Sequence, residues 1–399
     1  MSRTKSEMVR GGWRGLRLAM PLAAIAGLAA CTGSLDRLGI GSSGPPPSAE
    51  PPPQSVIGGG QVRVALILPL SAGGNAGLAA QSMKNAAEMA ITEFKNPNIQ
   101  LLVKDDAGQP QTAQAAAQQA LDEGAQIIVG PLFAQSVSAV GQIARPRGVP
   151  VIAFSTDANV AARGVYLLSF LPESDVNRII SFAASRGKRS IAALVPDNAY
   201  GAVVEGALQQ AASRGSRIVV LERYRPDAAS IAAAAARVAQ AARNADAIFI
   251  ADGADGVPQV VQALTAAGVD LRRLQPLGTG LWDDPRILEL PALQTGWFAA
   301  PDSAGFRNFA QRYRARYGQD PVRTATLAYD AVALVAALVK TQGPQGFSEQ
   351  VLTNASGFAG IDGIFRFRPD GPNDRGLAVL RVSPPGQPIS PPQRSFSGT

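Results

Sequence analysis

The stretch VRVALILPLSAGGNAGLAAQSMKNAAEMAITEF, residues 62–94, changes its hydrophobic period partway along. Its first part, VRVALILPL (62–70), is an almost unbroken apolar run that includes Pro69 near its end. Such a run is typical of a strand buried on both faces of a sheet. In the second part (79–94) the apolar residues share one helical face: Met83, Ala86, Ala87, Ala90, Ile91 and Phe94. The stretch therefore predicts a strand followed by a helix.

The same strand-then-helix pattern recurs along the chain in two series. The first series continues with predicted strands at 99–106, 125–130 and 150–155, and predicted helices at 110–123 and 134–146. The second has predicted helices at 175–186, 201–213, 228–243 and 256–267, and predicted strands at 190–197, 217–224, 247–252 and 274–280. Two further helices are predicted at 303–317 and 323–340. This alternation predicts an α/β fold of two lobes, each a doubly wound parallel sheet.

Residues 1–30 have the layout of a signal peptide. Basic residues precede an apolar run from Leu18 to Ala30, and this run of roughly 13 residues is shorter than the about 20 that a membrane-spanning helix needs. Leu28 to Cys31 resembles the bacterial lipobox, which implies cleavage before Cys31 and lipidation of that residue. Several acyl chains anchor a protein stably. The alternative is an ordinary signal peptide followed by a chance cysteine.

Residues 31–60 comprise Cys31 and a tether rich in proline, glycine and serine, which we expect to be disordered. We expect the same of the tail at 391–399. The whole chain carries a formal net charge of +7, but residues 1–30 hold five basic residues and one acid. Removing them (5 − 1 = 4) leaves +3 on the mature chain. This small charge argues against nucleic acid as a partner.

The composition excludes several classes of enzyme. The chain has no histidine and a single cysteine, so a histidine base is excluded and an intramolecular disulfide is impossible. It also lacks the glycine-rich phosphate loops of nucleotide-binding proteins. We therefore predict no enzymatic activity, no cofactor and no metal. A hydrolase with a serine–lysine or carboxylate pair is the alternative left open.

Five segments, in order, resemble the leucine-binding-protein group of type 1 periplasmic binding proteins. They are LPLSAGGNAGLAAQSMKNAAEMAI (68–91), IIVGPLFAQSVSAV (127–140), DNAYGAVVEGALQQA (197–211), GQDPVRTATLAYDAVALVAALVK (318–340) and FAGIDGIFRF (358–367). The resemblance covers nearly all of residues 61–385. It implies the type 1 periplasmic binding protein fold, in which a three-segment hinge joins the two lobes.

The resemblance also implies where the lobes divide. The hinge crossings are expected near 168–173, 298–303 and 366–377. Lobe 1 would comprise 61–170 plus 301–366, and lobe 2 would comprise 171–300 plus 377–390. Such a hinge permits the lobes to close around a bound molecule.

Ligands of parallel sheets bind beyond the carboxyl ends of the strands. The candidate ligand-binding residues are Ser71, Asp105, Ser136, Ser155, Thr156, Tyr200, Asp252, Asp255 and Trp282. Amino-acid receptors of the resembled group place a hydroxyl just after the Gly-Pro turn, where this chain has Ala134, and Ser136 is displaced. Asp252 or Asp255 would be the acid that pairs with a ligand ammonium. These departures count against a free amino acid as the ligand.

Several candidates also have purely structural interpretations. Asp105 could be a solvated turn carboxylate, and Ser155 and Thr156 could cap the next helix. Tyr200 could pack at the hinge. Trp282 could either stack on a ligand or cover the edge of the sheet, and the sequence does not distinguish the two.

Two functions fit these patterns. The leading interpretation is a regulator that activates penicillin-binding proteins in peptidoglycan synthesis, because such outer-membrane lipoproteins resemble the chain in lipobox, linker and domain. The alternative is the substrate-binding receptor of an ABC importer for a branched-chain-like amino acid or a similar polar solute. The partner would be a penicillin-binding protein in the first case, and an ABC permease with a small polar ligand in the second. Both place the protein on the periplasmic side of the envelope, lipid-anchored, and we expect the outer membrane rather than the inner. Thr32 after the cysteine, in place of an aspartate, is compatible with export to the outer membrane of a Gram-negative cell.

Overall fold

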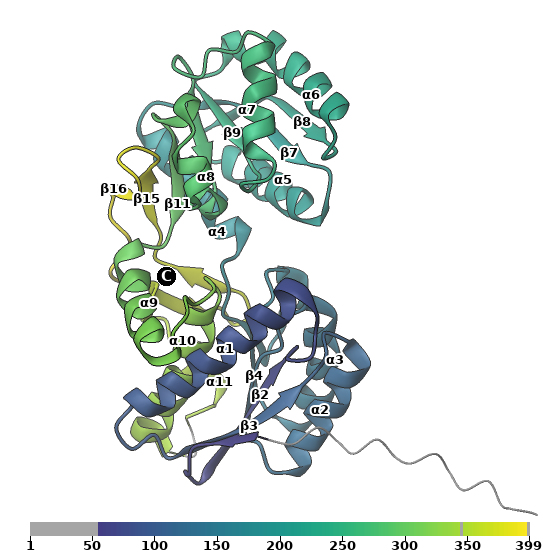
Figure 1. Ribbon diagram of the computed structural model, residues 1–399, viewed down its shortest axis with the longest axis vertical. Coiled ribbons are helices and arrows are strands. Elements are labelled where there is room, and N and C mark those ends of the chain that lie inside the picture. Colours follow the sequence, from purple (N-terminus) through teal and green to yellow (C-terminus); the bar gives the residue numbers. More distant parts are fainter. Residues whose placement is uncertain (1–54, 344–345, 397–399) are drawn as a thin grey trace, which may run out of the picture. The chain divides into compact units, whose positions relative to one another are not determined.

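The computed structural model describes residues 55–343 and 346–396, which form two α/β lobes (Figure 1). The predicted signal peptide, Cys31 and residues 32–54 lie outside the described residues. The tether was expected to extend to residue 60, but β1 (Ser55–Ile57) already pairs antiparallel with β3. The free edge of β3 offers backbone hydrogen bonds to this segment, so the folded part begins before residue 61.

Lobe 1 is built on a six-stranded sheet. The strand order is β1, β3 (Ile99–Asp105), β2 (Val62–Leu68), β4 (Ile127–Val129), β5 (Val151–Ala153) and β6 (Val165–Leu167). Every neighbouring pair is parallel except β1 with β3. The helices of this lobe are α1 (Gly74–Glu93), α2 (Pro110–Asp122), α3 (Ala134–Ala144), α9 (Ser303–Tyr317) and α10 (Ala325–Gln342).

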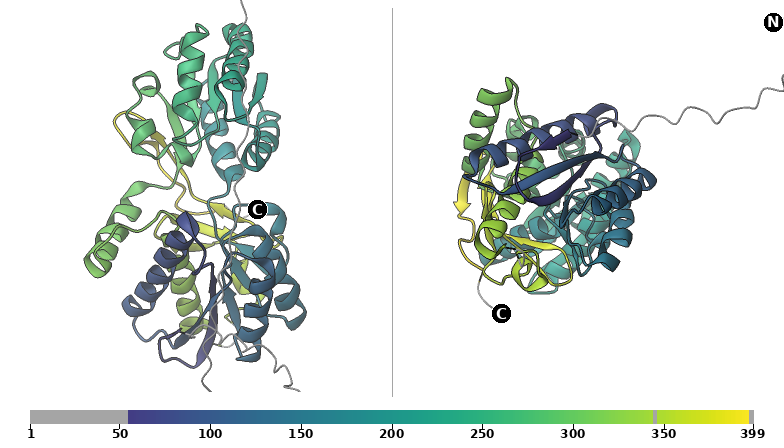
Figure 2. Two further views of the ribbon diagram at one scale, coloured as in Figure 1. Left: turned by 45° about the vertical axis from the view of Figure 1, so that its right-hand side comes forward. Right: turned by 90° about the horizontal axis from the view of Figure 1, so that it is seen from below.

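The side chains of β2 alternate between two hydrophobic cores. Val64, Leu66 and Leu68 pack with residues of α1 and α10, whereas Ala65 and Ile67 pack with residues of α2 and α3. Figures 1 and 2 show the green α10 beside the purple-blue α1, on the opposite side of the sheet from α2 and α3. A continuous apolar run is therefore required, because both faces of the strand are covered.

Lobe 2 is built on a seven-stranded sheet. The strand order is β16 (Gln387–Ser390), β15 (Ala378–Arg381), β11 (Trp297–Ala300), β10 (Gln275–Gly278), β9 (Ala247–Ile250), β7 (Ser190–Pro196) and β8 (Arg217–Tyr224). Its strands are parallel from β11 to β8, but β15 and β16 pair antiparallel at the other edge. Figure 1 shows these two strands, in yellow, beside the green β11. The prediction of a parallel sheet is thus confirmed for the strands from β11 to β8. At the edge formed by β15 and β16 the pairing is antiparallel, so the sheet as a whole is mixed.

Helices cover both faces of this second sheet as well. Ala192 and Leu194 of β7 pack with α6 (Ala228–Ala241) and α7 (Val257–Ala266). The alternate residues of β7 pack with α4 (Pro172–Ser185) and α5 (Ala199–Ala212). Both lobes are therefore doubly wound, which confirms the predicted fold class.

The chain passes between the two sheets at three places. These crossings lie between β6 and α4, between β11 and α9, and between β14 (Asn373–Arg375) and β15. Beside them lies a three-stranded antiparallel sheet of β12 (Phe358–Gly360), β13 (Gly363–Phe367) and β14, which the sequence did not reveal. The short helices α8 (Pro285–Leu288) and α11 (Glu349–Leu352) were also not predicted. The residue-level lobe boundaries given above stay a prediction.

The tail after β16 was expected to be disordered from residue 391, and its last residues, 397–399, lie outside the described part of the chain. Its residues 391–396 contact the folded protein: an Arg178 guanidinium nitrogen donates to the Pro391 carbonyl at 3.2 Å, and the Arg366 guanidinium lies 4.8 Å from the centre of the Phe396 ring. These contacts contradict a tail that is free from residue 391 onward.

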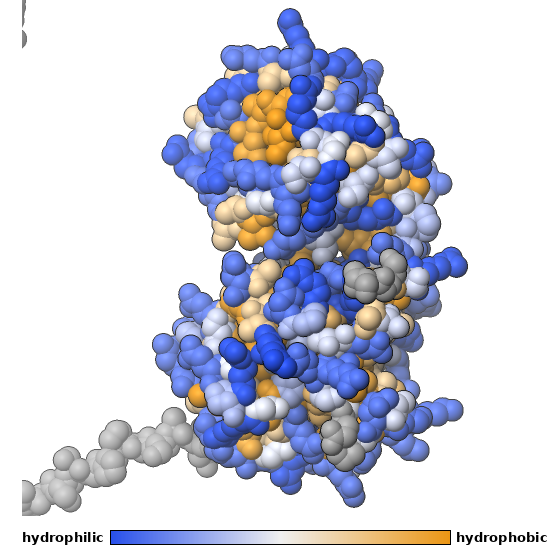
Figure 3. Space-filling view, turned by 180° about the vertical axis from the view of Figure 1, so that it is seen from behind, coloured by the Kyte–Doolittle hydropathy of each residue, from blue (hydrophilic) through white to orange (hydrophobic). Residues whose placement is uncertain are grey.

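The surface of the described residues is largely polar, and on the face in Figure 3 the apolar residues form separate patches. The large apolar side chains that remain exposed are Val56, Leu78, Phe133 and Leu281. Leu78, Phe133 and Leu281 all follow the carboxyl ends of parallel strands. Across residues 55–343 and 346–396, no helix combines the length and apolar character that crossing a membrane would require.

Candidate ligand-binding site

A cavity of about 380 Å³ lies where the chain crosses between the two sheets. Thr156, Phe170 and Arg323 line it from segments next to the first sheet, and Tyr200 and Leu281 line it from segments next to the second. Its volume lies within the range of small-molecule sites. The cavity is therefore the candidate site on which the chemistry below depends.

Tyr200 is positioned by the start of α5. The Asn198 side chain caps this helix by accepting a hydrogen bond from the Gly201 backbone N–H at 2.9 Å. A Cβ at Gly201 would come within 1.8 Å of the Pro196 carbonyl oxygen, so only glycine fits here. The Tyr200 hydroxyl shares a 2.8 Å hydrogen bond with the buried Thr279 hydroxyl. Burial raises the pKa of Tyr200, and the residue lines the cavity as a neutral aromatic group.

Asp175 supplies a carboxylate from the first turn of α4. Its Oδ2 accepts a hydrogen bond from the Gly280 backbone N–H at 2.9 Å. Burial raises the pKa of Asp175 to about 7, although the Gly280 hydrogen bond and the Arg375 charge act in the opposite direction. The sequence did not mark this residue, because an acid in the first turn of a helix is an ordinary way to complement the helix dipole.

The candidates at the edge of lobe 1 have structural surroundings of their own. Asp105 Oδ1 accepts hydrogen bonds from the backbone N–H groups of Ser71, at 3.2 Å, and Ala107, at 2.9 Å. Burial raises the pKa of Asp105, but hydrogen bonding from the Ser71 side chain and from nearby backbone N–H groups outweighs it, and the net shift is downward. Ser136 is fully buried in the first turn of α3. The structure does not place Ser71, Asp105 or Ser136 in the cavity wall.

The neighbouring candidates Ser155 and Thr156 differ in their exposure. Ser155 is buried, and its hydroxyl accepts a hydrogen bond from the Asp157 backbone N–H at 3.1 Å. The side chain that caps the next short helix is Asp157, which accepts from the Asn159 backbone N–H at 3.0 Å, so Ser155 does not have the expected capping role. Thr156 is exposed and lines the cavity. Of this pair, only Thr156 is available to a ligand in the cavity.

The acidic candidates of lobe 2 are occupied by other contacts. Asp252 Oδ2 accepts a 2.6 Å hydrogen bond from the Tyr224 hydroxyl. Asp255 is exposed and forms an ion pair with Arg286 at 2.7 Å. Neither lines the cavity. The acidic residues that do line it are Asp175 and Asp283.

Trp282 belongs to the core of lobe 2. Its side chain is fully buried, and its indole N–H donates to the Ile250 carbonyl at 3.2 Å. A Cβ at Gly278 would lie 2.1 Å from the indole ring, so the absence of a side chain there makes room for the ring. A ring buried in this way cannot stack on a ligand, and that part of the sequence prediction is wrong.

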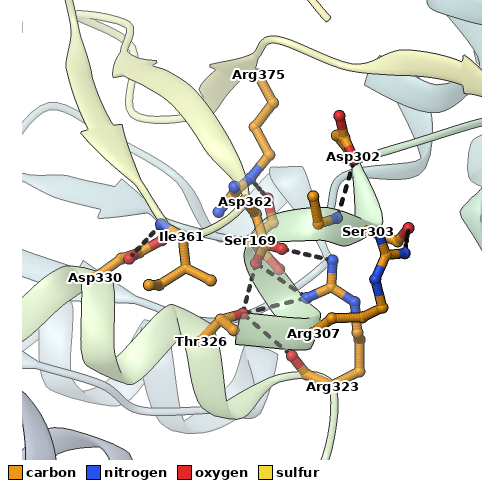
Figure 4. A network of polar contacts seen from close by, with 11 residues as sticks. Ser169, Asp302, Ser303, Arg307, Arg323, Thr326, Asp330, Ile361, Asp362 and Arg375 are labelled. Atoms are coloured by element: carbon orange, nitrogen blue, oxygen red, sulfur yellow. Dashed lines mark hydrogen bonds and ion pairs between the residues drawn. The ribbon is translucent and has the colours of Figure 1, made fainter. Parts of the chain in front are cut away.

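A network of buried charged groups supports the cavity from lobe 1 (Figure 4). Two Arg323 nitrogens donate to the two Asp362 carboxylate oxygens at 3.0 and 2.7 Å. The Arg323 guanidinium also lies 4.6 Å from the centres of both the Phe170 and Phe306 rings. Asp362 accepts a further hydrogen bond from the Thr326 hydroxyl at 2.6 Å. These contacts fix Arg323 at the wall of the cavity.

Arg375 lies deeper in the same network, with 7% of its surface exposed. Its Nε donates to the Ser169 carbonyl at 2.9 Å, while neither terminal nitrogen has a hydrogen-bond partner in the part of the chain that the structure describes. Burial lowers the pKa of Arg375, and the nearby Asp362 and Asp330 carboxylates oppose that shift. Arg366 and Arg368, which lie near Arg375 in sequence, pair with Asp374 and Asp370 instead, so no sequence pattern singled out Arg375.

Asp330, on α10, completes this group. Its Oδ1 accepts a hydrogen bond from the Ile361 backbone N–H at 2.8 Å (Figure 4). Burial raises the pKa of Asp330 to about 7. No group of three or more acidic side chains that could hold a metal ion occurs within residues 55–343 and 346–396.

Two doubly wound sheets, three crossings between them and an adjoining cavity define a two-lobed binding protein of the type 1 periplasmic binding protein fold. The chain belongs to the periplasmic binding protein family, whose model matches residues 61–387. This membership implies that it faces the periplasm. No curated protein sequence gives a significant match.

Solved structures agree with the family assignment. A putative branched-chain amino acid ABC transporter from Rhodospirillum rubrum has a TM-score of 0.68 and 19% identity, covering 80% of this chain and 97% of that one. A branched-chain amino acid ABC transporter periplasmic ligand-binding protein from Burkholderia xenovorans LB400 has a TM-score of 0.65 and 20% identity. That match covers 80% of this chain and 90% of the other.

A solute-binding protein of an ABC transporter from Rhodopseudomonas palustris BisB5, in complex with 3,4-dihydroxybenzoic acid, has a TM-score of 0.59 and 19% identity. That match covers 80% of this chain and 92% of the other. At these identities the likeness shows the fold. The descriptions of these proteins name transport and solute or ligand binding, and none names catalysis.

Proposed function

We propose that the protein is the substrate-binding receptor of an ABC importer and holds a small solute in the cavity at the crossings. The observation that carries this proposal is the cavity of about 380 Å³, whose wall combines residues from segments next to both sheets. A solute held there would contact both lobes at once, so binding would favour the arrangement in which both sets of contacts are made. The family match and the descriptions of the solved structures support a transport function.

The leading interpretation from the sequence, an activator of penicillin-binding proteins, gains no support from the family match or from these solved structures. We therefore prefer the importer interpretation, with an ABC permease as the protein partner. The imperfect amino-acid pattern at Ala134 and Ser136 had favoured the activator. A receptor whose ligand is not an amino acid accounts for that departure equally well.

A binding screen tests the proposed function. Purified mature protein would be heated with leucine, isoleucine, phenylalanine, benzoate or 3-methylbutylamine, and Tm would be measured. A true ligand at a hundredfold excess over its Kd stabilises the folded state by about 2.7 kcal/mol, which raises Tm by several degrees. Leu281→Arg places a charge in the cavity wall and should abolish the shift.

The matched control is Leu78→Arg, which changes an exposed leucine outside the cavity wall and should preserve the shift. A protein that no solute stabilises, but that retains a penicillin-binding protein in a pull-down, would refute the receptor function and restore the activator interpretation.

We also propose that Cys31 carries the lipid anchor and that the lobes divide at the boundaries given above, namely 61–170 plus 301–366 and 171–300 plus 377–390. The sequence around Cys31 and the positions of the three crossings support these two assignments. Cys31→Ser should release the protein from the membrane fraction into the soluble fraction. Separation of inner from outer membranes would then test the predicted outer-membrane location.

A further inference from the structure

The cavity at the crossings has an unbalanced charge. Three charged side chains line it, namely Asp175, Asp283 and Arg323. Neither Asp175 nor Asp283 forms a salt bridge with any residue in the described ranges. Within the same ranges the Asp175 carboxylate accepts a single hydrogen bond, from a neutral donor, the Gly280 N–H, at 2.9 Å. The two carboxylates therefore lack a contacting cation.

Arg323 does not fill that role, because its own charge is already balanced. Its terminal nitrogens donate to both oxygens of Asp362, and the guanidinium lies 4.6 Å from the centres of the Phe170 and Phe306 rings. A guanidinium recognises a carboxylate best through two parallel N–H donors. In Arg323 these two donors already bind Asp362, so they are not available to a ligand carboxylate.

The rest of the wall suits an apolar body. Phe170, Leu281, Ala300 and Pro301 line the cavity, and 47% of the surface of Leu281 is exposed. The Tyr200 hydroxyl is engaged with Thr279, so this residue offers its ring to the cavity. Burying these surfaces against an apolar ligand is favourable at about 25 cal/mol per Å².

We propose that the cavity selects a solute with a cationic group on an aliphatic or aromatic body, such as a primary amine, and that Asp175 binds the cation. Asp283 contributes a second negative charge. This proposal rests on the proposed receptor function and names the ligand class for the same cavity. Burial raises the pKa of Asp175 to about 7, although the Arg375 charge opposes that shift, so the charged carboxylate has no ionic partner in direct contact. A bound ammonium would supply that partner through a charge-assisted hydrogen bond.

Matched compounds separate the charge of the ligand from its shape. Leucine, 3-methylbutylamine and 4-methylpentanoate share a branched aliphatic body but are zwitterionic, cationic and anionic. The aromatic pair is 2-phenylethylamine and 3-phenylpropanoate. Titration calorimetry with the purified mature protein should show each amine binding at least tenfold more tightly than its matched carboxylate.

Substitutions then test the assigned residue. Asp175→Asn removes the charge but keeps a side-chain oxygen for the Gly280 N–H, and it should weaken amine binding by about tenfold to a hundredfold. Glu289→Gln removes one negative charge from an exposed position in the same lobe, outside the cavity wall, and should leave amine binding within about twofold. Circular dichroism would establish that both variants are folded.

The possible results are distinct. Tighter binding of the carboxylates or of leucine, or amine binding that a folded Asp175→Asn variant retains, overturns the assigned ligand class and leaves the receptor function standing. The same holds if none of these compounds binds while another solute raises Tm. If no solute of any class binds, the receptor function itself is wrong.

Discussion

The strands β2 and β14 are both buried, but they bury different chemistry. Val64, Leu66 and Leu68 of β2 are fully buried apolar side chains that pack with α1 and α10. The buried side chains of β14 are the Asn373 amide and the Arg375 guanidinium. An apolar side chain is satisfied by any close packing, whereas a buried polar group needs a partner in one particular place. The sheets are thus stabilised by packing, and the crossings by a few specific polar contacts.

This difference predicts the largest stability effect at the crossings. Asp362→Asn keeps the shape of the side chain but removes the carboxylate that holds Arg323 and Thr326. Because the partly buried Arg323 guanidinium is left without its counter-ion, the free energy of unfolding should fall by about 4 kcal/mol. Urea denaturation measures this change.

The control is Asp320→Asn, which removes the carboxylate of an exposed ion pair with Arg314. An exposed pair contributes less than about 1 kcal/mol. If the two variants lose equal stability, the carboxylate of Asp362 has no special role in the buried network.

A core substitution should cost somewhat less. Leu66→Ala removes a fully buried side chain from the centre of the first sheet and should lower the free energy of unfolding by about 3 kcal/mol. Val56→Ala, at a half-exposed position of β1, should change it by less than about 0.5 kcal/mol. Near-equal losses at the two positions would contradict the description of β2 as the packed centre of lobe 1.

The effect that best separates the two regions is one that depends on pH. Burial raises the pKa of Asp330 to about 7 in the folded state, above its ordinary value near 4 in the unfolded chain. The folded state therefore binds this proton more tightly, and stability from this group is present below pH 4 and lost as the pH rises toward 7. Arg375, Asp362 and Arg323 are the charged groups that act on Asp330.

Asp330→Asn removes this titration. The difference in stability between the variant and the native protein should therefore shift in favour of the variant as the pH rises from 4 to 7, by about 1.4 kcal/mol for each unit of pKa shift that is lost. Leu66→Ala should show no such trend relative to the native protein. A flat difference curve for Asp330→Asn would show that Asp330 titrates normally.

The same contrast explains what could be predicted from the sequence. The strand predicted at 62–70 is observed as Val62–Leu68, and the helix predicted at 110–123 as Pro110–Asp122. Long elements follow from hydrophobic period alone. The strands β1, β12, β13 and β14 were not predicted, because short antiparallel strands depend on the edge that each one pairs with, and that pairing is a tertiary property.

The candidate site was only partly predictable for the same reason. Thr156 and Tyr200 follow strand ends and do line the cavity. Trp282 follows a strand end as well, but its ring is buried in the core, in space that is open because Gly278 has no side chain. Asp175 lies in the first turn of α4, and Arg323 lies just before α10. Charged residues are common near helix ends, where they interact with the helix dipole, so neither position stands out in the sequence. Only the folded chain brings them to one cavity.

A crystal structure of the protein grown with 2-phenylethylamine would test the central claim most directly. Our account predicts that the compound lies in the cavity at the crossings, with its ring against Tyr200 and Leu281 and its ammonium within hydrogen-bond distance, about 3 Å, of the Asp175 carboxylate. A cavity that stays empty at saturating amine, or a compound bound with its ammonium away from both Asp175 and Asp283, would contradict it.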